Sequence, residues 1–185
     1  PKSRLIVKEA DHLDIVRSVL AGESEIAMAS QLVIDGQDVL KNIPEELEFV
    51  PLFACRAYCC CSPNFPMTRF KPINLKTMLD YPLVLHEPDK YFLKPIIEMV
   101  CPLEEANIVW LSKTAMLKKF LDKGICLGFA FVNESSSQSL WEQPEGVLIP
   151  LKEHIVFNEG YIIKRGQVLS EKTMHLIEYL QLYFN

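Results

Sequence analysis

The feature that most limits the fold is an extended stretch of fifteen residues in the first third of the chain. It covers residues 48–62 and reads EFVPLFACRAYCCCS. Ordinary strands have about five or six residues, and Pro51 would interrupt pairing inside the stretch because proline has no N–H. A segment of this length is predicted to pass from one lobe of the protein to another.

Predicted strands and helices alternate before this segment. A strand over residues 5–10 leads to a helix that Asp11 can cap and Gly22 should end, with Leu13 in its apolar face. Residues 25–30 form a short apolar run of the kind found in buried parallel strands. This succession predicts an α/β fold with parallel sheets covered by helices on both faces.

The alternation continues after the segment, where Asn74 can start a short helix. The remaining predicted elements are strand 81–86, helix 91–100, strand 107–111, a helix capped by Ser112 and ended by Gly124, strands 125–132, 147–151 and 155–163, and a last helix capped by Ser170 with Leu176, Ile177, Leu180 and Phe184 inward. Polar residues 133–146 predict a surface loop that can hold one helical turn near Trp141.

Two long extended segments bracket the middle of the chain, so two lobes are predicted. Lobe I would combine residues 1–58 with 155–185, and lobe II would be inserted as residues 59–154. A ligand would bind in the cleft, near the carboxyl ends of the strands, as open α/β sheets generally arrange it.

Composition excludes several classes of protein. A net charge of −5 without a basic cluster argues against unaided binding to nucleic acid. The longest apolar stretch, residues 125–132, is far shorter than the roughly 18 residues of a membrane-spanning helix. The amino end meets charge too early for a signal peptide. Six irregularly spaced cysteines suit the reducing cytoplasm better than a secreted framework.

Cys55, Cys59, Cys60 and Cys61 are the most unusual group of residues in the chain. Thiolates bind soft metals and act as redox nucleophiles, so a thiol or metal sensor is one alternative. In an extended strand, however, Cys59 and Cys61 face one side and Cys60 the other, which suits a tetrahedral ion poorly. Packing within a buried strand is therefore the favoured interpretation.

Polar residues that follow predicted strands, or lie in the crossing segment, are candidates for contacts with a ligand in the cleft: Ser30, Gln31, Arg56, His86, Glu87, Ser112 and Lys113. Backbone N–H groups where a helix begins can receive an anion, and the planar fork of an arginine matches a carboxylate. Each candidate has a structural alternative, which is a polar loop near His86, a helix cap for Ser112 and a salt bridge for Arg56.

No pattern for catalysis accompanies these residues. The four histidines lie far apart, and the sequence has no nucleophile with an adjacent base, no phosphate-binding loop and no metal-ligand spacing. Catalytic residues can converge only in space, but the pattern favours a binding protein that is not an enzyme and that uses no metal or cofactor.

Several short sequences, taken in order, resemble the effector-binding domain of LysR-type transcriptional regulators. GESEIAMAS at residues 22–30 is similar to the family's "gxxDlai" strand, YPLVL at 81–85 to its "yPlI" strand, and KGICLGFAF at 123–131 to its "V..G.Gia.lP" element. Phe65-Pro66-Met67 stands where the family has His-Pro-Leu, and LSEK at 169–172 resembles the start of its last helix. Each likeness is weak alone, but their order and spacing extend over nearly the whole chain.

This resemblance implies an α/β fold of two Rossmann-like lobes joined by two crossing strands, like that of type 2 periplasmic binding proteins. It also implies a cytoplasmic regulator that binds a small-molecule effector between the lobes and forms a dimer or tetramer. DNA would be contacted only through an N-terminal winged helix-turn-helix. That domain and the family's usual first strand and helix have no counterpart in this sequence, so one wall of the pocket is expected to be missing. The alternative is a free-standing solute-binding protein of the same fold.

Overall fold

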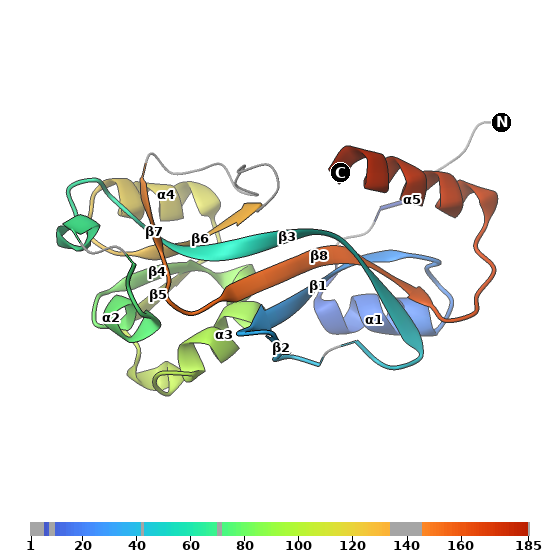
Figure 1. The fold of residues 1–185 in the computed structure, drawn as a ribbon, viewed down its shortest axis with the longest axis horizontal. Helices are drawn as coiled ribbons and strands as arrows, with labels where there is room; N and C mark the ends of the chain where they lie inside the picture. Colours follow the sequence, from blue (N-terminus) through green and yellow to red (C-terminus); the bar gives the residue numbers. More distant parts are fainter. Residues whose placement is uncertain (1–5, 8–9, 42, 70–71, 134–145, 185) are drawn as a thin grey trace. The chain divides into compact units, whose positions relative to one another are not determined.

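The structure of the chain is a computed structural model that describes residues 6–7, 10–41, 43–69, 72–133 and 146–184, except for the side chains of Met67 and Thr68. Helices and strands alternate along it (Figure 1), as expected for the α/β class. Their order, with η for 3-10 helices, is α1 (His12–Leu20), β1 (Ala27–Ile34), β2 (Gln37–Asp38), β3 (Leu47–Cys61), η1 (Pro66–Arg69), α2 (Leu75–Leu79), β4 (Leu83–His86), η2 (Glu87–Asp89), α3 (Lys90–Glu98), η3 (Leu103–Glu105), β5 (Ile108–Leu111), α4 (Thr114–Asp122), β6 (Gly128–Asn133), β7 (Val147–Pro150), β8 (Ile155–Lys164) and α5 (Glu171–Phe184).

The chain divides into two compact units. Unit 1 comprises Pro1–Gln31, Lys41–Ala54 and Asn158–Asn185, and unit 2 comprises Leu32–Leu40 and Cys55–Phe157. Strands β1, β3 and β8 each run from one unit into the other. The lobe bounds of residues 1–58 with 155–185 and of 59–154 stay a prediction.

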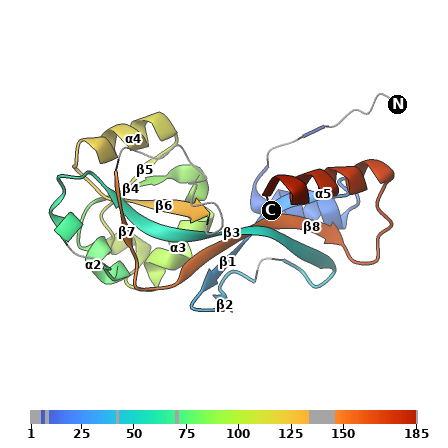
Figure 2. The ribbon, with the colours of Figure 1, turned by 45° about the horizontal axis from the view of Figure 1, so that its top comes forward.

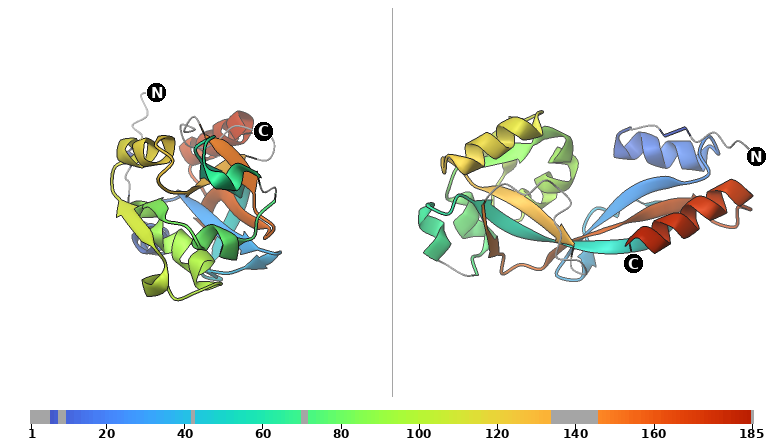
Figure 3. Two further views of the ribbon diagram at one scale, coloured as in Figure 1. Left: turned by 90° about the vertical axis from the view of Figure 1, so that its left-hand side faces the viewer. Right: turned by 90° about the horizontal axis from the view of Figure 1, so that it is seen from above.

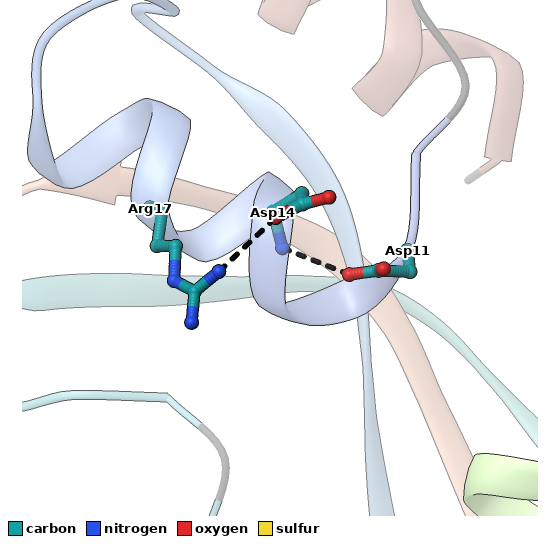
Figure 4. Close-up of polar contacts among 3 residues, drawn as sticks. All are labelled: Asp11, Asp14 and Arg17. Atoms are coloured by element: carbon teal, nitrogen blue, oxygen red, sulfur yellow. Dashed lines mark hydrogen bonds and ion pairs between the residues drawn. The ribbon is translucent and has the colours of Figure 1, made fainter.

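Helix α1 begins and ends where the sequence predicts. The Asp11 side chain accepts a hydrogen bond of 3.0 Å from the N–H of Asp14, and the Arg17 guanidinium lies 3.3 Å from the Asp14 carboxylate (Figure 4). Gly22 follows the helix with φ +74°, a left-handed conformation that glycine adopts without steric cost. These local signals fix the ends of the helix without any tertiary contact.

The apolar face of α1 is narrower than predicted. Val16 and Val19 are buried in the core of unit 1, but Leu13 is 56% exposed. Leu13 precedes Val19 by six residues, which turns it about 120° away from Val19 around the helix. Helices α1 and α5 lie on opposite sides of the strands of unit 1 (Figure 3), so this part of the sheet is covered on both faces as expected.

Strand β3 has the predicted length of 15 residues and remains a strand through Pro51. The neighbouring strand β8 comes close at this point, where its Gly160 lies beside the proline. A Cβ atom at Gly160 would lie 2.2 Å from the Val50 carbonyl oxygen and 2.9 Å from the Pro51 Cα. Glycine alone lets the two backbones approach this closely.

The direction of strand pairing differs from the prediction. The strands are hydrogen-bonded in the order β2-β1-β8-β3-β6, with β7 also paired to β3. Strand β3 pairs antiparallel with both β6 and β7, whereas β4 and β5 pair in parallel. The expectation of parallel sheets therefore holds for β4 with β5 and is wrong for β3 with β6 and β7, since a short buried apolar run has the same composition in either direction.

A two-residue hairpin that was not predicted joins β1 and β2. Asp35 and Gly36 have φ angles of 48° and 83°, and Ile34 pairs with Gln37 across the turn. Two central residues with positive φ match the twist of a hairpin, and Asp-Gly is a preferred sequence for it. Strand β1 consequently continues past Ser30, where the predicted strand ended.

Parts of two predictions fall on undescribed residues. Of the predicted strand over residues 5–10, Ile6, Val7 and Ala10 are described; they are exposed and in no regular structure, so the strand is not formed there. Residues 134–145 of the predicted loop, including Trp141, lie outside the described residues.

Unit 2 is held together by an apolar cluster between β3, β4, β6 and α4. Its buried members are Cys60, Val84, Leu121, Cys126 and Ala130. In unit 2, α4 lies on one side of the strands, and α2 and α3 lie on the other (Figure 2). The cluster thus fixes α4, and the loop that precedes it, against one face of β3.

Helix α5 is capped as predicted, because the Ser170 hydroxyl accepts the N–H of Thr173 at 3.3 Å. The predicted inward side chains of Leu176, Ile177, Leu180 and Phe184 are half-buried. Thr173 is the buried residue of this helix, and its hydroxyl donates to the Glu25 carboxylate. The Ser170 hydroxyl donates to the same carboxylate at 2.7 Å, which ties the start of α5 to the segment before β1.

Candidate functional site

The carboxyl ends of three strands meet at one edge of unit 2. Strands β4 and β5 run in parallel, with His86 level with Leu111. Leu83, at the start of β4, forms a parallel bridge with Leu127, directly before β6. Strands β4, β5 and β6 therefore end at the same edge, which we call the carboxyl edge of unit 2. This is the position where open α/β sheets bind ligands.

His86 and Glu87 lie at this edge, where β4 ends and η2 begins. The His86 Nδ1 is 3.3 Å from an Asp89 carboxylate oxygen, and Glu87 is exposed. Asp89 precedes α3 but does not cap it with its side chain. Burial raises the pKa of the Asp89 carboxyl above its ordinary value, and the neighbouring His86 opposes this rise. The imidazole is thus held beside a carboxylate, that of Asp89, which is not among the seven predicted site residues.

Ser112 and Lys113 follow β5 at the same edge, and both are exposed. The prediction that Ser112 caps the helix is wrong. Lys113 occupies the N-cap position of α4, and its side chain makes no capping hydrogen bond. The cap falls one residue later because the first helical hydrogen bonds run from Met116 and Leu117 to the Lys113 carbonyl. The Ser112 hydroxyl is therefore not used to begin α4.

Arg56 lies in β3, paired with Val132 near the end of β6. Alternation along the strand places Arg56 on the same face as Cys60, which belongs to the cluster that packs against α4. Its Nε is buried and has no hydrogen-bond partner among the residues that the structure describes. No ion pair to Arg56 occurs within the described ranges either, so the salt-bridge alternative is not supported.

Ser30 and Gln31 belong to unit 1, at the end of its share of β1. The Ser30 hydroxyl donates to the Glu159 carboxylate at 2.7 Å, and the Asn158 amide donates to the Gln31 side-chain oxygen at 3.2 Å. Sequence reasoning missed these two partners in β8. Adjacent polar residues inside the otherwise apolar run IVFNEGYII were the available signal.

Five of the seven candidates thus lie in unit 2, at the carboxyl edge or in the strand β3 beside the end of β6: Arg56, His86, Glu87, Ser112 and Lys113. Ser30 and Gln31 lie together in unit 1. That all seven contact one ligand stays a prediction.

The cysteine cluster is buried and unsuited to thiolate chemistry. Burial raises the pKa of Cys60 to about 12 and that of Cys126 to about 11, and it also raises the pKa of Cys59. The thiolate is the reactive form, so these thiols are protonated at neutral pH. All six cysteines lie in the described part of the chain, and none is in a disulfide. The described residues also contain no group of three or more His, Cys, Asp or Glu side chains that could hold a metal ion.

Comparison with known proteins decides the family. The sequence profile of the LysR substrate binding domain matches residues 1–184. The chain belongs to this family. The LysR family is one of transcriptional regulators, which agrees with the resemblance seen in the sequence. No curated protein sequence matches the chain. Among the described residues of this LysR domain, no helix is long and apolar enough to span a membrane.

Solved structures share the fold of this LysR domain. HinK, a LysR family transcriptional regulator from Pseudomonas aeruginosa, matches with a TM-score of 0.66 and 12% identity over 96% of this chain and 59% of its own. The effector binding domain of QuiR in complex with shikimate matches with a TM-score of 0.59 and 10% identity, covering 95% of this chain and 78% of that one. The Synechocystis PCC6803 CcmR regulatory domain in complex with 2-PG gives 0.62 and 13%, covering 95% and 80%. These matches confirm the predicted two-lobed fold class of the type 2 periplasmic-binding-protein kind. The chain spans less than two thirds of the length of HinK.

Proposed function

We propose that this chain is the effector-sensing domain of a LysR-type transcriptional regulator and that it is not an enzyme. The observation that carries the proposal is the family match over residues 1–184. It is supported by two domains of the same fold that were solved with small molecules, QuiR with shikimate and CcmR with 2-PG.

In the proposed mechanism, an effector binds between the two lobes in the cytoplasm and favours one of their arrangements. A ligand shifts such an equilibrium only by its difference in affinity for the two states. A dimer or tetramer would pass the change to winged helix-turn-helix domains outside this chain, which contact DNA. The free energy of effector binding is then coupled to that of DNA binding. The coupling is reciprocal, so DNA changes the affinity for the effector by the same factor.

The seven candidate residues are proposed as the effector contacts. Support comes from the carboxyl edge of unit 2, where two adjacent parallel strands are followed by polar residues and by the starts of η2 and α4. Unit 1 would contribute Ser30 and Gln31, whose side chains are oriented by Glu159 and Asn158. Asp89 would orient His86 in the same way.

The test uses the complete regulator that contains this chain. Its affinity for the DNA upstream of its own gene is measured by fluorescence anisotropy, with and without each member of a panel of small acids and their uncharged amides. A sensing domain should change DNA affinity by about 5-fold or more for at least one compound. A compound that binds the chain but leaves DNA affinity unchanged at saturation would contradict the proposal.

The site assignment has its own test with that same compound. His86→Ala and Lys113→Ala should each weaken its binding by about 10-fold, the loss expected for one hydrogen bond to a charged group. Lys119→Ala, an exposed residue further along α4, is the matched control and should bind like the parent. Unchanged binding in both site variants would show that the contacts lie elsewhere.

A further inference from the structure

Arg56 differs from the other arginines whose contacts the structure gives. Arg17 is an exposed side chain whose guanidinium lies 3.3 Å from the Asp14 carboxylate (Figure 4). The Nε of Arg165 donates to the Glu45 carbonyl at 2.8 Å. The Nε of Arg56 is buried, and within the described residues it has no acceptor.

Such an arrangement costs stability. A buried N–H without an acceptor loses its hydration, which costs about 1–3 kcal/mol, and more when the group is charged. Buried polar groups in proteins are almost always satisfied, so this guanidinium calls for a missing acceptor. Arg56 shares its face of β3 with Cys60, which packs in an apolar cluster with Ala130. An apolar side chain at position 56 would suit these surroundings.

The position of Arg56 indicates where the acceptor would come from. Arg56 pairs with Val132, one residue before β6 ends, so it lies toward the carboxyl edge of unit 2. Its face of β3 is the one against which α4 packs, and α4 begins at this edge, directly after Lys113. An acceptor arriving at the carboxyl edge would therefore meet a guanidinium and the start of a helix, both of which favour negative charge.

We propose that the effector carries an oxyanion group, a carboxylate or a phosphate, and that Arg56 binds this group. The inference rests on the proposed function and adds the chemical class of the ligand. Nε–H and an adjacent N–H of the guanidinium form parallel hydrogen bonds to two oxygens of the anion, a geometry that lysine cannot reproduce. Lys113, exposed at the same edge, adds attraction at longer range.

The experiment follows the Nε–H signal of Arg56 by ¹⁵N NMR in the 185-residue chain. The probes are acetate, inorganic phosphate and acetamide, the uncharged counterpart of acetate. Acetate or phosphate should shift the signal in a saturable way, and acetamide should not. The stronger of the two anions tells whether the group is a carboxylate or a phosphate. A signal that acetamide moves as much as the anions do, or that none of the three moves, would overturn the proposal.

Variants separate Arg56 from general charge effects. Binding of the stronger anion, measured by calorimetry, should weaken by about 10-fold or more in Arg56→Gln. Arg56→Lys should recover part of that loss, because it restores charge without the fork. Arg17→Gln removes the same charge from an exposed site in unit 1 and should bind like the parent. Equal weakening in Arg17→Gln and Arg56→Gln would reduce the effect to net charge and refute the assignment.

The two proposals can fail separately. If the complete regulator responds to an uncharged amide and Arg56→Gln responds equally, sensing stands and the oxyanion class falls. If anions bind at Arg56 but no bound anion alters DNA affinity, the site stands and the sensing function falls.

Discussion

Polar side chains of two strands, β1 and β3, differ in whether they have hydrogen-bond partners. In unit 1, Ser30 and Gln31 of β1 are each hydrogen-bonded to a side chain of β8. In unit 2, Arg56 of β3 has a buried Nε without a partner among the described residues. Paired polar groups stabilise the contact between strands, whereas an unsatisfied one lowers stability and persists when function requires it. The hydrogen bonds of Ser30 and Gln31 thus join β1 to β8, whereas the unsatisfied Nε of Arg56 is the group proposed to bind a ligand.

The largest test of this comparison concerns the strand contact in unit 1. Gly160→Ala would place a Cβ 2.2 Å from the Val50 carbonyl oxygen and 2.9 Å from the Pro51 Cα, so backbone must move. We expect a loss of more than about 3 kcal/mol in the free energy of unfolding, measured by urea titration. Gly166→Ala is the control, since it meets no atom within 4 Å and adds only the strain of φ +69°. It should cost about 1 kcal/mol. Similar losses in both would show that the close approach does not limit unit 1.

The next test compares two serines. Ser30→Ala removes a 2.7 Å hydrogen bond to the Glu159 carboxylate, and we expect it to cost about 1.5–3 kcal/mol. Ser112→Ala removes an exposed hydroxyl that caps nothing, so the change should stay within about 0.5 kcal/mol. Both values come from the same urea titrations. A costly Ser112→Ala together with a neutral Ser30→Ala would contradict the stabilising role given to the Ser30 hydrogen bond.

A third test predicts a gain. Arg56→Met keeps a long side chain but removes the unsatisfied N–H, and it should raise the free energy of unfolding by about 1 kcal/mol without ligand. Arg165→Met is the control, because it removes an Nε–H that donates to the Glu45 carbonyl at 2.8 Å. It should lower stability by about 0.5–1 kcal/mol. Destabilisation by Arg56→Met to the same extent would mean that Arg56 contributes to folding as an ordinary paired arginine does.

Local signals in the sequence predicted the elements more completely than their pairing. Asp11, Gly22 and Ser170 marked helix ends correctly because capping depends on a few neighbouring residues. Strand β1 was ended too early at Ser30, since the partners that keep Ser30 and Gln31 in the strand lie 127 residues or more along the chain. The Asp35-Gly36 turn, by contrast, was a local signal that could have extended the strand.

The candidate site was predictable only in outline. Polar residues after strands located His86, Glu87, Ser112 and Lys113 near the ends of β4 and β5, because that rule depends on topology alone. The pairing of Asp89 with His86 and that of Glu159 with Ser30 were not predicted, because they depend on side-chain geometry. The unsatisfied Nε of Arg56 is likewise a property of the packed structure, since a sequence does not show which arginine side chains have hydrogen-bond partners.

The smallest expected effect is a pH dependence confined to unit 1. Hydrogen bonds from the Thr173 hydroxyl, and then from Ser170, lower the pKa of Glu25 below its ordinary value of 4.5. A depressed folded-state pKa contributes stability that is present above the unfolded pKa and is lost as the pH falls through the folded one. The contribution should stay well under about 1 kcal/mol, because the carboxylate is close to solvent.

Urea titrations of the parent and Glu25→Gln should therefore differ at pH 7 and converge below pH 4.5. The control Glu23→Gln, at an exposed residue two positions away, should follow the parent throughout. A difference between parent and Glu25→Gln that persists unchanged into acid would mean that Ser170 and Thr173 hold α5 through the shape of residue 25 and not through its charge.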